Sequence, residues 1–326
     1  MSFSQIQSVL KPGLERVNAL IDQSLESDIS LLDSTNKALR EHPGKMMRPM
    51  LSLLAAGAAG KPVEASYRYA AASELLHNAT LLHDDVVDGA GERRGIPTVF
   101  SLLGGGPAVL LGDYWLVKCL QLILSAGPGS QRVLDLFSRT LGHLTEAELL
   151  QMQKASTGDT TEEDYLRIIF GKTASLFQLS ALSGALSVGA EEPVVQALGE
   201  FARGVGIAFQ IKDDILDYAP ASAALGKPVG IDLKEQKITQ PLLSALEQVP
   251  ASEALEIRSL VASAADHPEH VQTVRAFVEK HSGVALAEER MDFYLKNAIS
   301  CLEILPESEE KSYLAKLALF VGQRTW

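Results

Sequence analysis

Two short stretches of the sequence carry clustered carboxylates between apolar residues. Residues 81–95 read LLHDDVVDGAGERRG, and residues 209–219 read FQIKDDILDYA. The first stretch contains the charged residues Asp84, Asp85, Asp88, Arg93 and Arg94. Most charge-rich stretches are solvated surfaces whose ion pairs contribute little to stability. The apolar flanks and the repeated acidic spacing instead favour a site that binds a cation.

Helix geometry places the outer acids of each stretch one turn apart. At about 100° per residue, Asp84 and Asp88 share a helix face with His77, and Asp213 and Asp217 share a face with Gln210. The opposite faces are apolar stripes made of Leu75, Ala79, Leu82 and Val86 in the first helix and Ala208, Ile211 and Ile215 in the second. Each pair of acids therefore faces away from a predicted core.

Like charges at i and i+4 destabilise an isolated helix by a few tenths of a kcal/mol, so the repeated pattern favours a bound cation. A few hard oxygen ligands that leave room for water suit Mg²⁺ bridging to a phosphate. One such motif alone is more often a solvated surface. Two copies, without the alternating lysines of a salt-bridged surface helix, favour a metal site.

Basic residues next to glycine or proline supply the complementary charge for a phosphate. They are Lys45 and Arg48 in HPGKMMRPM, Arg93 and Arg94 in RRG, Lys172 beside Thr173 in GKTASLF, and Lys227 and Lys237 in GKPVGIDLKEQKITQPL. Singly, each is more often a solvated charge or a helix cap. None has the glycine spacing of a P-loop.

The composition limits the possible partners. The chain has 326 residues, is 46% hydrophobic and has a formal net charge of −12. The acidic balance argues against nucleic-acid binding and against general affinity for anionic membranes. Cys119 and Cys301 form no metal or disulfide pattern, and no basic-then-apolar leader is present, so we expect a cytoplasmic protein.

Apolar residues recur at three- and four-residue spacing along nearly the whole chain, which predicts an all-α fold. Glycine and proline clusters separate about a dozen helices without a long linker, so we expect a single domain over residues 1–326. Residues 173–190 carry no charge but contain Ser, Thr, Gln and Gly. This composition favours a buried core helix over a membrane span.

Five motifs in order make the chain resemble the trans-isoprenyl diphosphate synthases, the polyprenyl synthetase family. They are GKMMRPML, LLHDDVVDGAGERRGIPT, AVLLGDYWL, GKTASLF, and FQIKDDILDY followed by GKPVGIDLKEQKITQPLL. Three positions depart from the family pattern: Phe100 replaces the usual Asn, Ile231 a polar residue, and Gln236 the glycine of EGK. Every Asp, Arg and Lys of the motifs is present.

The resemblance implies an isoprenoid synthase fold, a helical bundle around a central cavity. It also implies a homodimer in which Asp84, Asp88, Asp213 and Asp217 hold Mg²⁺ against an allylic diphosphate such as farnesyl diphosphate. The same diphosphate would be neutralised by Arg93, Lys172, Lys227 and Lys237. The second substrate, isopentenyl diphosphate, would be bound by Lys45, Arg48, His77 and Arg94.

This chemistry needs no side-chain nucleophile. Metal ions and basic side chains stabilise the charge that builds on the departing diphosphate. Oxygen dipoles of Thr173 and Gln210 would stabilise the allylic carbocation, and the released diphosphate would accept the final proton. The family's pocket floor lies four and five positions before the first motif Asp, at Thr80 and Ala79. Both are small, which indicates a medium- or long-chain polyprenyl product.

Three alternatives compete with this interpretation. A short-chain farnesyl or geranylgeranyl synthase would share every motif, but DDVVD lacks the two-residue insertion typical of the bacterial enzymes. A terpene cyclase would need no isopentenyl site, which GKMMRP and RRG argue against. A non-catalytic subunit would commonly lose one acidic motif, whereas both are whole here.

Overall fold

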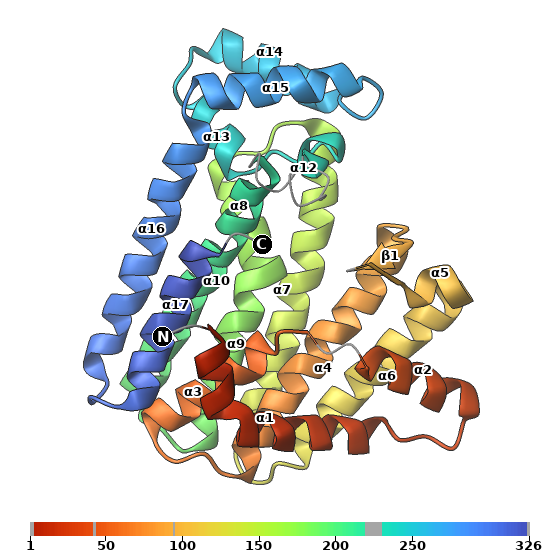
Figure 1. Cartoon of the computed structure of the whole chain (residues 1–326), viewed down its shortest axis with the longest axis vertical. Coiled ribbons are helices and arrows are strands. Elements are labelled where there is room, and N and C mark those ends of the chain that lie inside the picture. The colour runs from red at the N-terminus through yellow and green to blue at the C-terminus, as the bar shows by residue number, and fades with distance from the viewer. Residues whose placement is uncertain (1–2, 42–43, 94, 219–229, 325–326) are drawn as a thin grey trace. The chain divides into compact units, whose positions relative to one another are not determined.

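The computed structural model describes residues 3–41, 44–93, 95–218 and 230–324, and these residues are almost entirely helical (Figure 1). The one sheet in this part of the chain is a two-stranded antiparallel hairpin. The all-α prediction is confirmed. The chain divides into two compact units, and each is described by itself. That they act as one domain stays a prediction.

The first unit comprises residues 1–138, 179–199 and 305–314. Four helices contribute residues to both units: α7 (Ser130–Thr157), α9 (Ser175–Ser187), α10 (Glu192–Tyr218) and α17 (Glu309–Gln323). The elements wholly inside the first unit are α1 (Phe3–Leu25), α2 (Ser30–Arg40), α3 (Met47–Ala59), α4 (Glu64–Val87), β1 (Glu92–Arg93), β2 (Ile96–Pro97), α5 (Val99–Leu103) and α6 (Gly105–Leu124).

Helix α4 forms the centre of the first unit and packs against α1, α3 and α6. Its core side is rich in alanine, and Ala70, Ala71 and Ala72 are fully buried, which allows neighbouring helices to approach closely. A side chain at Gly112 of α6 would lie 2.3 Å from the His83 ring. The glycine of the AVLLGDYWL motif is therefore required by the contact between α4 and α6.

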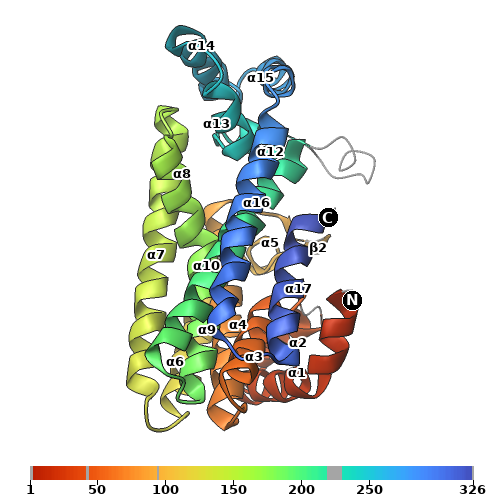
Figure 2. The same ribbon diagram turned by 90° about the vertical axis from the view of Figure 1, so that its left-hand side faces the viewer.

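The second unit comprises residues 139–178, 200–304 and 315–326. The elements wholly inside it are α8 (Glu162–Ile169), the π-helix η1 (Phe170–Ala174), α12 (Ile231–Lys234), α13 (Gln240–Leu246), α14 (Ala251–Ala262), α15 (Pro268–Lys280), α16 (Gly283–Cys301) and the 3-10 turn η2 (Leu302–Ile304). Helix α16 contacts α13 and α15 near its first residues, as Figure 2 shows.

The first four residues of the GKTASLF motif lie in η1, where the helix widens by one residue, and the last three begin α9. Such π-turns are rare and recur at functional sites. A side chain at Gly171 would lie 2.5 Å from the His143 carbonyl oxygen and 2.4 Å from Ala147 Cβ. The glycine thus lets η1 pack directly on α7, which fixes the position of the following Lys172 and Thr173.

One described helix, α6, is long and apolar enough to cross a membrane by length and composition, and 39% of its apolar window is buried. Residues 173–190, which we expected to be a core helix, fall in η1, α9 and the turn after it, and most of them are buried. That expectation is confirmed.

Candidate active site

The acids of the first motif lie at the C-terminal end of α4. Leu75, Ala79 and Leu82 of the predicted stripe are buried, whereas Asp84 is half-buried and Asp88, the C-cap residue that follows the helix, is exposed. The Asp88 amide donates to the Asp84 carbonyl at 2.8 Å, so the helix continues between the two acids. The structure therefore presents both carboxylates on the side of α4 away from its core.

Asp85, the middle acid, has a different role from its neighbours. It is 5% exposed, and Nε and Nη2 of Arg93 both donate to its Oδ1 at 2.8 Å. The hairpin of β1 and β2 brings Arg93 back toward α4. Within this stretch, the positive charge of Arg93 thus neutralises the negative charge of Asp85. Arg94 lies outside the described residues.

The predicted isopentenyl diphosphate residues of this unit lie on two elements. Lys45 precedes Met46, whose φ of 54° starts α3, and Arg48 follows within its first turn. Both basic side chains are half-buried. His77 on α4 is half-buried too, and its carbonyl accepts a hydrogen bond from Thr80 Oγ1 at 2.8 Å.

A cavity of about 440 Å³ borders α4 within the first unit. Its walls include the α4 residues Asn78, Leu81, Leu82 and Asp85, together with Trp115 from α6. Ala79, which is fully buried, and Thr80 do not line it. Two routes for a hydrocarbon chain beside α4 are therefore distinguishable: one past Ala79, and one through this cavity.

The acids of the second motif lie at the C-terminal end of α10. Ile211 and Ile215 are buried as predicted, and Asp213 and Asp217 are half-buried. Asp213 Oδ1 pairs with Nη2 of Arg324 at 2.7 Å. The same guanidinium donates to the Phe209 carbonyl at 2.7 Å and lies 3.8 Å from the centre of the Phe209 ring. A C-terminal cation thus neutralises one predicted metal ligand.

Asp217 caps the start of α12. Its two carboxylate oxygens accept from the backbone amides of Ile231 at 3.1 Å and Asp232 at 3.2 Å, at the start of α12. Carboxylates commonly cap helix starts in this way. Ile231 contributes only its backbone amide to this cap. The polar side chain that the family usually has at position 231 is therefore not needed for it.

Thr173 and Gln210 meet in a directional hydrogen-bond chain. Tyr165 donates its hydroxyl to Asp214 Oδ2 at 2.6 Å, Gln210 Nε2 donates to Asp214 Oδ1 at 3.0 Å, and Thr173 donates to Gln210 Oε1 at 2.9 Å. The buried Asp214 thereby orients the amide so that its oxygen faces Thr173. This arrangement leaves the lone pairs of the Thr173 oxygen available to a cationic group.

Three members of this hydrogen-bond chain, Tyr165, Gln210 and Asp214, line a cavity of about 220 Å³ in the second unit, which is lined also by Lys172, Asp232 and Lys237. Lys172 Nζ lies 2.6 Å from Glu148 of α7, and Lys237 Nζ lies 2.5 Å from Glu235. Each predicted phosphate ligand thus has an acidic neighbour in the absence of phosphate. Lys227 lies outside the described residues.

Gln236, which stands where the family has glycine, adopts the left-handed conformation with φ of 58°. Non-glycine residues rarely adopt this conformation. Its Nε2 donates to the Ala262 carbonyl of α14 at 2.5 Å. A side-chain bond therefore accompanies the strained backbone next to Lys237.

Two acids at this cavity have raised pKa values. Burial raises the pKa of Asp214 well above its usual range, and the nearby Asp232 raises it further, while the bonds from Tyr165 and Gln210 oppose the shift. Burial also raises the pKa of Asp232 to about 7, with Asp217 adding to the effect and Lys237 opposing it. The site therefore concentrates negative charge that a cation would relieve.

We expect Asp232→Asn to stabilise the metal-free protein at pH 8 but not at pH 4. The folded pKa of Asp232 exceeds the unfolded value of about 3.9, so folded protein binds more protons between pH 4 and 7 and loses stability as the pH rises. The gain at pH 8 should be about 1–3 kcal/mol. Urea unfolding in EDTA at both pH values measures it. Asp292→Asn, at an exposed position of α16, is the control. An equal gain in unfolding free energy for Asp232→Asn at pH 4 and pH 8 would contradict the prediction.

We expect Tyr165→Phe to lower kcat about tenfold while changing KM for isopentenyl diphosphate little, because Gln210 loses its fixed orientation. Steady-state kinetics with both substrates measure the two constants. Tyr67→Phe, half-buried on α4, removes the same hydroxyl elsewhere. Equal kcat in both variants would show that Tyr165 does not position the amide.

Four residues at these sites were not predicted from the sequence: Glu148, Tyr165, Asp214 as a positioning acid, and Arg324. Tyr165 lies 49 positions from Asp214, and Arg324 lies 115 positions after Phe209, whose carbonyl it contacts on α10. The one signal available was the apolar spacing of α8, which buries Tyr165. Sequence spacing alone cannot show which distant side chain meets which acid.

An all-α protein with two acid-rich helix ends and a hydrogen-bond chain of Thr173, Gln210, Asp214 and Tyr165 has the features of an isoprenoid synthase. The sequence pattern of the polyprenyl synthetases matches residues 29–278. The octaprenyl diphosphate synthase of Haemophilus influenzae is 35% identical to this chain and covers 100% of it, with 98% of that protein matched. The chain therefore belongs to the polyprenyl synthetase family, and it is a prenyltransferase with the isoprenoid synthase fold.

Solved structures agree with this assignment. A decaprenyl diphosphate synthase from Rhodobacter capsulatus is similar with a TM-score of 0.92 and 34% identity, and 100% of both chains is covered. A polyprenyl synthase from Caulobacter crescentus, complexed with calcium and isoprenyl diphosphate, has a TM-score of 0.89 and 30% identity over 100% of this chain and 98% of that one.

Proposed function

We propose that this enzyme extends an allylic diphosphate with isopentenyl diphosphate, by trans head-to-tail condensation, to a medium- or long-chain polyprenyl diphosphate. The observation that carries the proposal is that both acidic motifs are whole, with their outer carboxylates facing away from a buried stripe. A non-catalytic subunit of a synthase would not need two complete sets of metal-binding acids.

Mg²⁺ fits the residues at both helix ends. The donors are carboxylate oxygens of Asp84 and Asp88 on α4 and of Asp213 and Asp217 on α10, the hard ligands that Mg²⁺ prefers. When bound, Mg²⁺ neutralises charge on the diphosphate leaving group. Asp213 would exchange its Arg324 partner for the metal, which frees that guanidinium for the same substrate charge.

The basic residues bind the two diphosphates. Arg93, Lys172, Lys227 and Lys237 are assigned to the allylic substrate, and Lys45, Arg48, His77 and Arg94 to isopentenyl diphosphate. Lys172 would turn from Glu148 to the incoming phosphate, since a bridging lysine is a mobile point charge. Glu148 and Glu235 hold Lys172 and Lys237 near the site before substrate arrives.

Departure of diphosphate leaves an allylic cation, and the Thr173 and Gln210 oxygens stabilise it. The fixed chain to Asp214 and Tyr165 supplies this stabilisation without reorganisation during the reaction. The isopentenyl double bond then attacks the cation, and the departed diphosphate removes the proton. No enzyme side chain forms a covalent intermediate.

The length of the product follows from the small residues Ala79 and Thr80 and from the octaprenyl and decaprenyl synthases that the chain resembles. Incubation with Mg²⁺, farnesyl diphosphate and labelled isopentenyl diphosphate, followed by sizing of the dephosphorylated products, tests the proposal. We expect products beyond four isoprene units. An end point at geranylgeranyl diphosphate would show a short-chain synthase, and release of a hydrocarbon without isopentenyl consumption would show a cyclase.

We also propose that the chain works as a homodimer in the cytoplasm. Large apolar side chains are exposed on α5 and α6, namely Leu102, Leu103, Leu110, Val117, Leu120 and Leu124. Soluble monomers rarely expose contiguous apolar patches of this kind, so a second copy that covers them is favoured over a membrane. Light scattering should give twice the chain mass of 35.0 kDa, and a monomer mass would contradict the proposal.

A further inference from the structure

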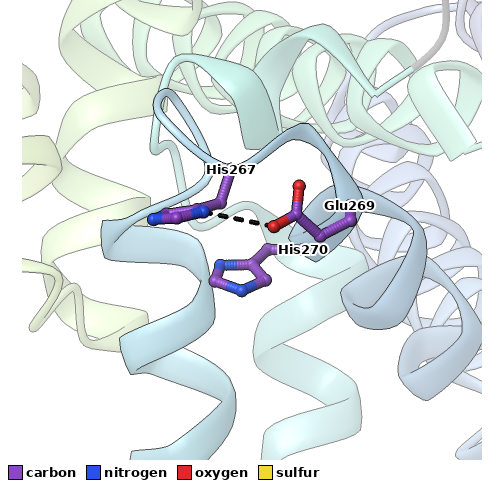
Figure 3. A group of neighbouring side chains, drawn as sticks. All are labelled: His267, Glu269 and His270. Atoms are coloured by element: carbon purple, nitrogen blue, oxygen red, sulfur yellow. Dashed lines mark hydrogen bonds and ion pairs between the residues drawn. The ribbon is translucent and has the colours of Figure 1, made fainter.

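Three side chains with metal-binding atoms meet where the turn after α14 leads into α15, away from the acidic motifs in the sequence. They are His267, Glu269 and His270, and Figure 3 shows them gathered on one side of the turn. One ligand atom from each lies within 4.8 Å of the others. His267 Nδ1 lies 3.1 Å from Glu269 Oε1, close to the spacing of about 3.3 Å between neighbouring ligands around a tetrahedral ion.

The histidine on the helix is already oriented by a hydroxyl. Ser263 Oγ lies 2.8 Å from His270 Nδ1 and also within bonding distance of the Ser259 carbonyl, at 3.1 Å, and the Leu260 carbonyl, at 3.2 Å. Because the single hydroxyl hydrogen is directed to these carbonyls, we assign the proton between Ser263 and His270 to Nδ1. His270 Nε2 then carries a free lone pair, and an oriented imidazole of this kind is typical of metal ligands.

We propose that His267, Glu269 and His270 bind one transition-metal ion of the Zn²⁺ type. Imidazole nitrogens suit Zn²⁺ and its neighbours, whereas Mg²⁺ prefers oxygen ligands alone. Two histidines and one glutamate leave a fourth position for water, because the side chains are exposed or half-exposed. The site therefore differs in ligand chemistry from the all-carboxylate ends of α4 and α10.

A bound ion would fasten His267, the N-cap of α15, to Glu269 and His270 in the first turn of that helix, and the bond from His270 to Ser263 links this turn to the residue that follows α14. Helix α15 reaches the second acidic motif, since Arg275 Nη2 donates to the Tyr218 carbonyl, at the end of α10, at 3.2 Å. Val271 Cγ1 also lies 3.0 Å from where a side chain at Gly230 would begin. The metal thus stabilises the start of a helix that contacts the last residue of α10 and the N-cap of α12.

Zinc titration of untagged, EDTA-stripped protein tests the site, with a chromophoric zinc chelator as competitor. Millimolar Mg²⁺ in the buffer competes with Zn²⁺ for the carboxylates of α4 and α10 but not for the histidines. We expect one Zn²⁺ per chain, with binding weakened about 100-fold or more in His270→Ala and in Glu269→Gln. Ser263→Ala should weaken it about tenfold through lost orientation of His270.

Glu279→Gln, an exposed glutamate at the other end of α15, is the matched control and should leave Zn²⁺ binding unchanged. Circular dichroism in EDTA should be the same for every variant, because the three ligands lie outside the core. Visible absorption of the Co²⁺ form, present in the wild type and absent in His270→Ala, gives a second readout. Equal Zn²⁺ affinity in the wild type and His270→Ala would overturn the proposal, whatever the synthase activity.

Discussion

Asp84→Ala is expected to lower kcat by several orders of magnitude while leaving the helical fold intact. The carboxylate lies opposite the buried stripe of α4, so its removal opens no core cavity. Its loss removes stabilisation of the charge that develops on the leaving diphosphate, which is commonly the largest single contribution to such a reaction. Single-turnover rates at saturating Mg²⁺ and both substrates measure the effect, and circular dichroism measures the fold.

Asp213→Ala should have the same effect, but it also removes the partner of the buried Arg324. Asp213→Asn separates metal binding from the contact with Arg324. Its amide oxygen can still accept a hydrogen bond from Arg324, while the negative charge that a metal ion needs is lost. We expect both variants to be nearly inactive and the Asn variant to keep the wild-type unfolding midpoint. Asp292→Ala on the exposed side of α16 is the control, and near-normal turnover in Asp84→Ala or Asp213→Asn would disprove a metal clamp with two sides.

Helical periodicity predicted the buried stripes of the acidic helices except at Val86, which is half-buried. The stripe residues Ala208, Ile211 and Ile215 are buried, and the outer acids lie opposite them, because a 3.6-residue repeat fixes the face of each side chain. The middle acid of each motif is buried although it is charged. Asp85 and Asp214 lie beside the stripe, and each is buried with a specific donor, Arg93 or Tyr165.

The partner of a buried acid depends on the tertiary fold, which the spacing of residues along one helix does not encode. Arg93 was assigned to substrate from the motif alone, whereas its guanidinium binds Asp85 in the absence of ligand. Arg93 can pair with Asp85 and bind a diphosphate at the same time, because a guanidinium has five N–H donors and the contact with Asp85 uses two of its nitrogens. The π-helix at Lys172 is likewise set by the packing of Gly171 on α7.

Ala79→Tyr is expected to shorten the product to about three or four isoprene units while the first condensation continues. Ala79 is fully buried one to two turns before Asp84, so a ring there would block a hydrocarbon chain that passes down α4 from the metal site. Chromatography of the dephosphorylated products measures the length. Because a ring in a close-packed region costs about 1–3 kcal/mol, the unfolding midpoint must be measured with the products.

Leu81→Tyr distinguishes the two routes beside α4. It places a ring of the same size two positions further along the helix, where the half-buried side chain lines the cavity of about 440 Å³ that Ala79 does not reach. If the chain grows past Ala79, Leu81→Tyr keeps the wild-type length and Ala79→Tyr does not. The reverse result would place the growing chain in the cavity beside Trp115. In that case the small residues at positions 79 and 80 would no longer support a long product.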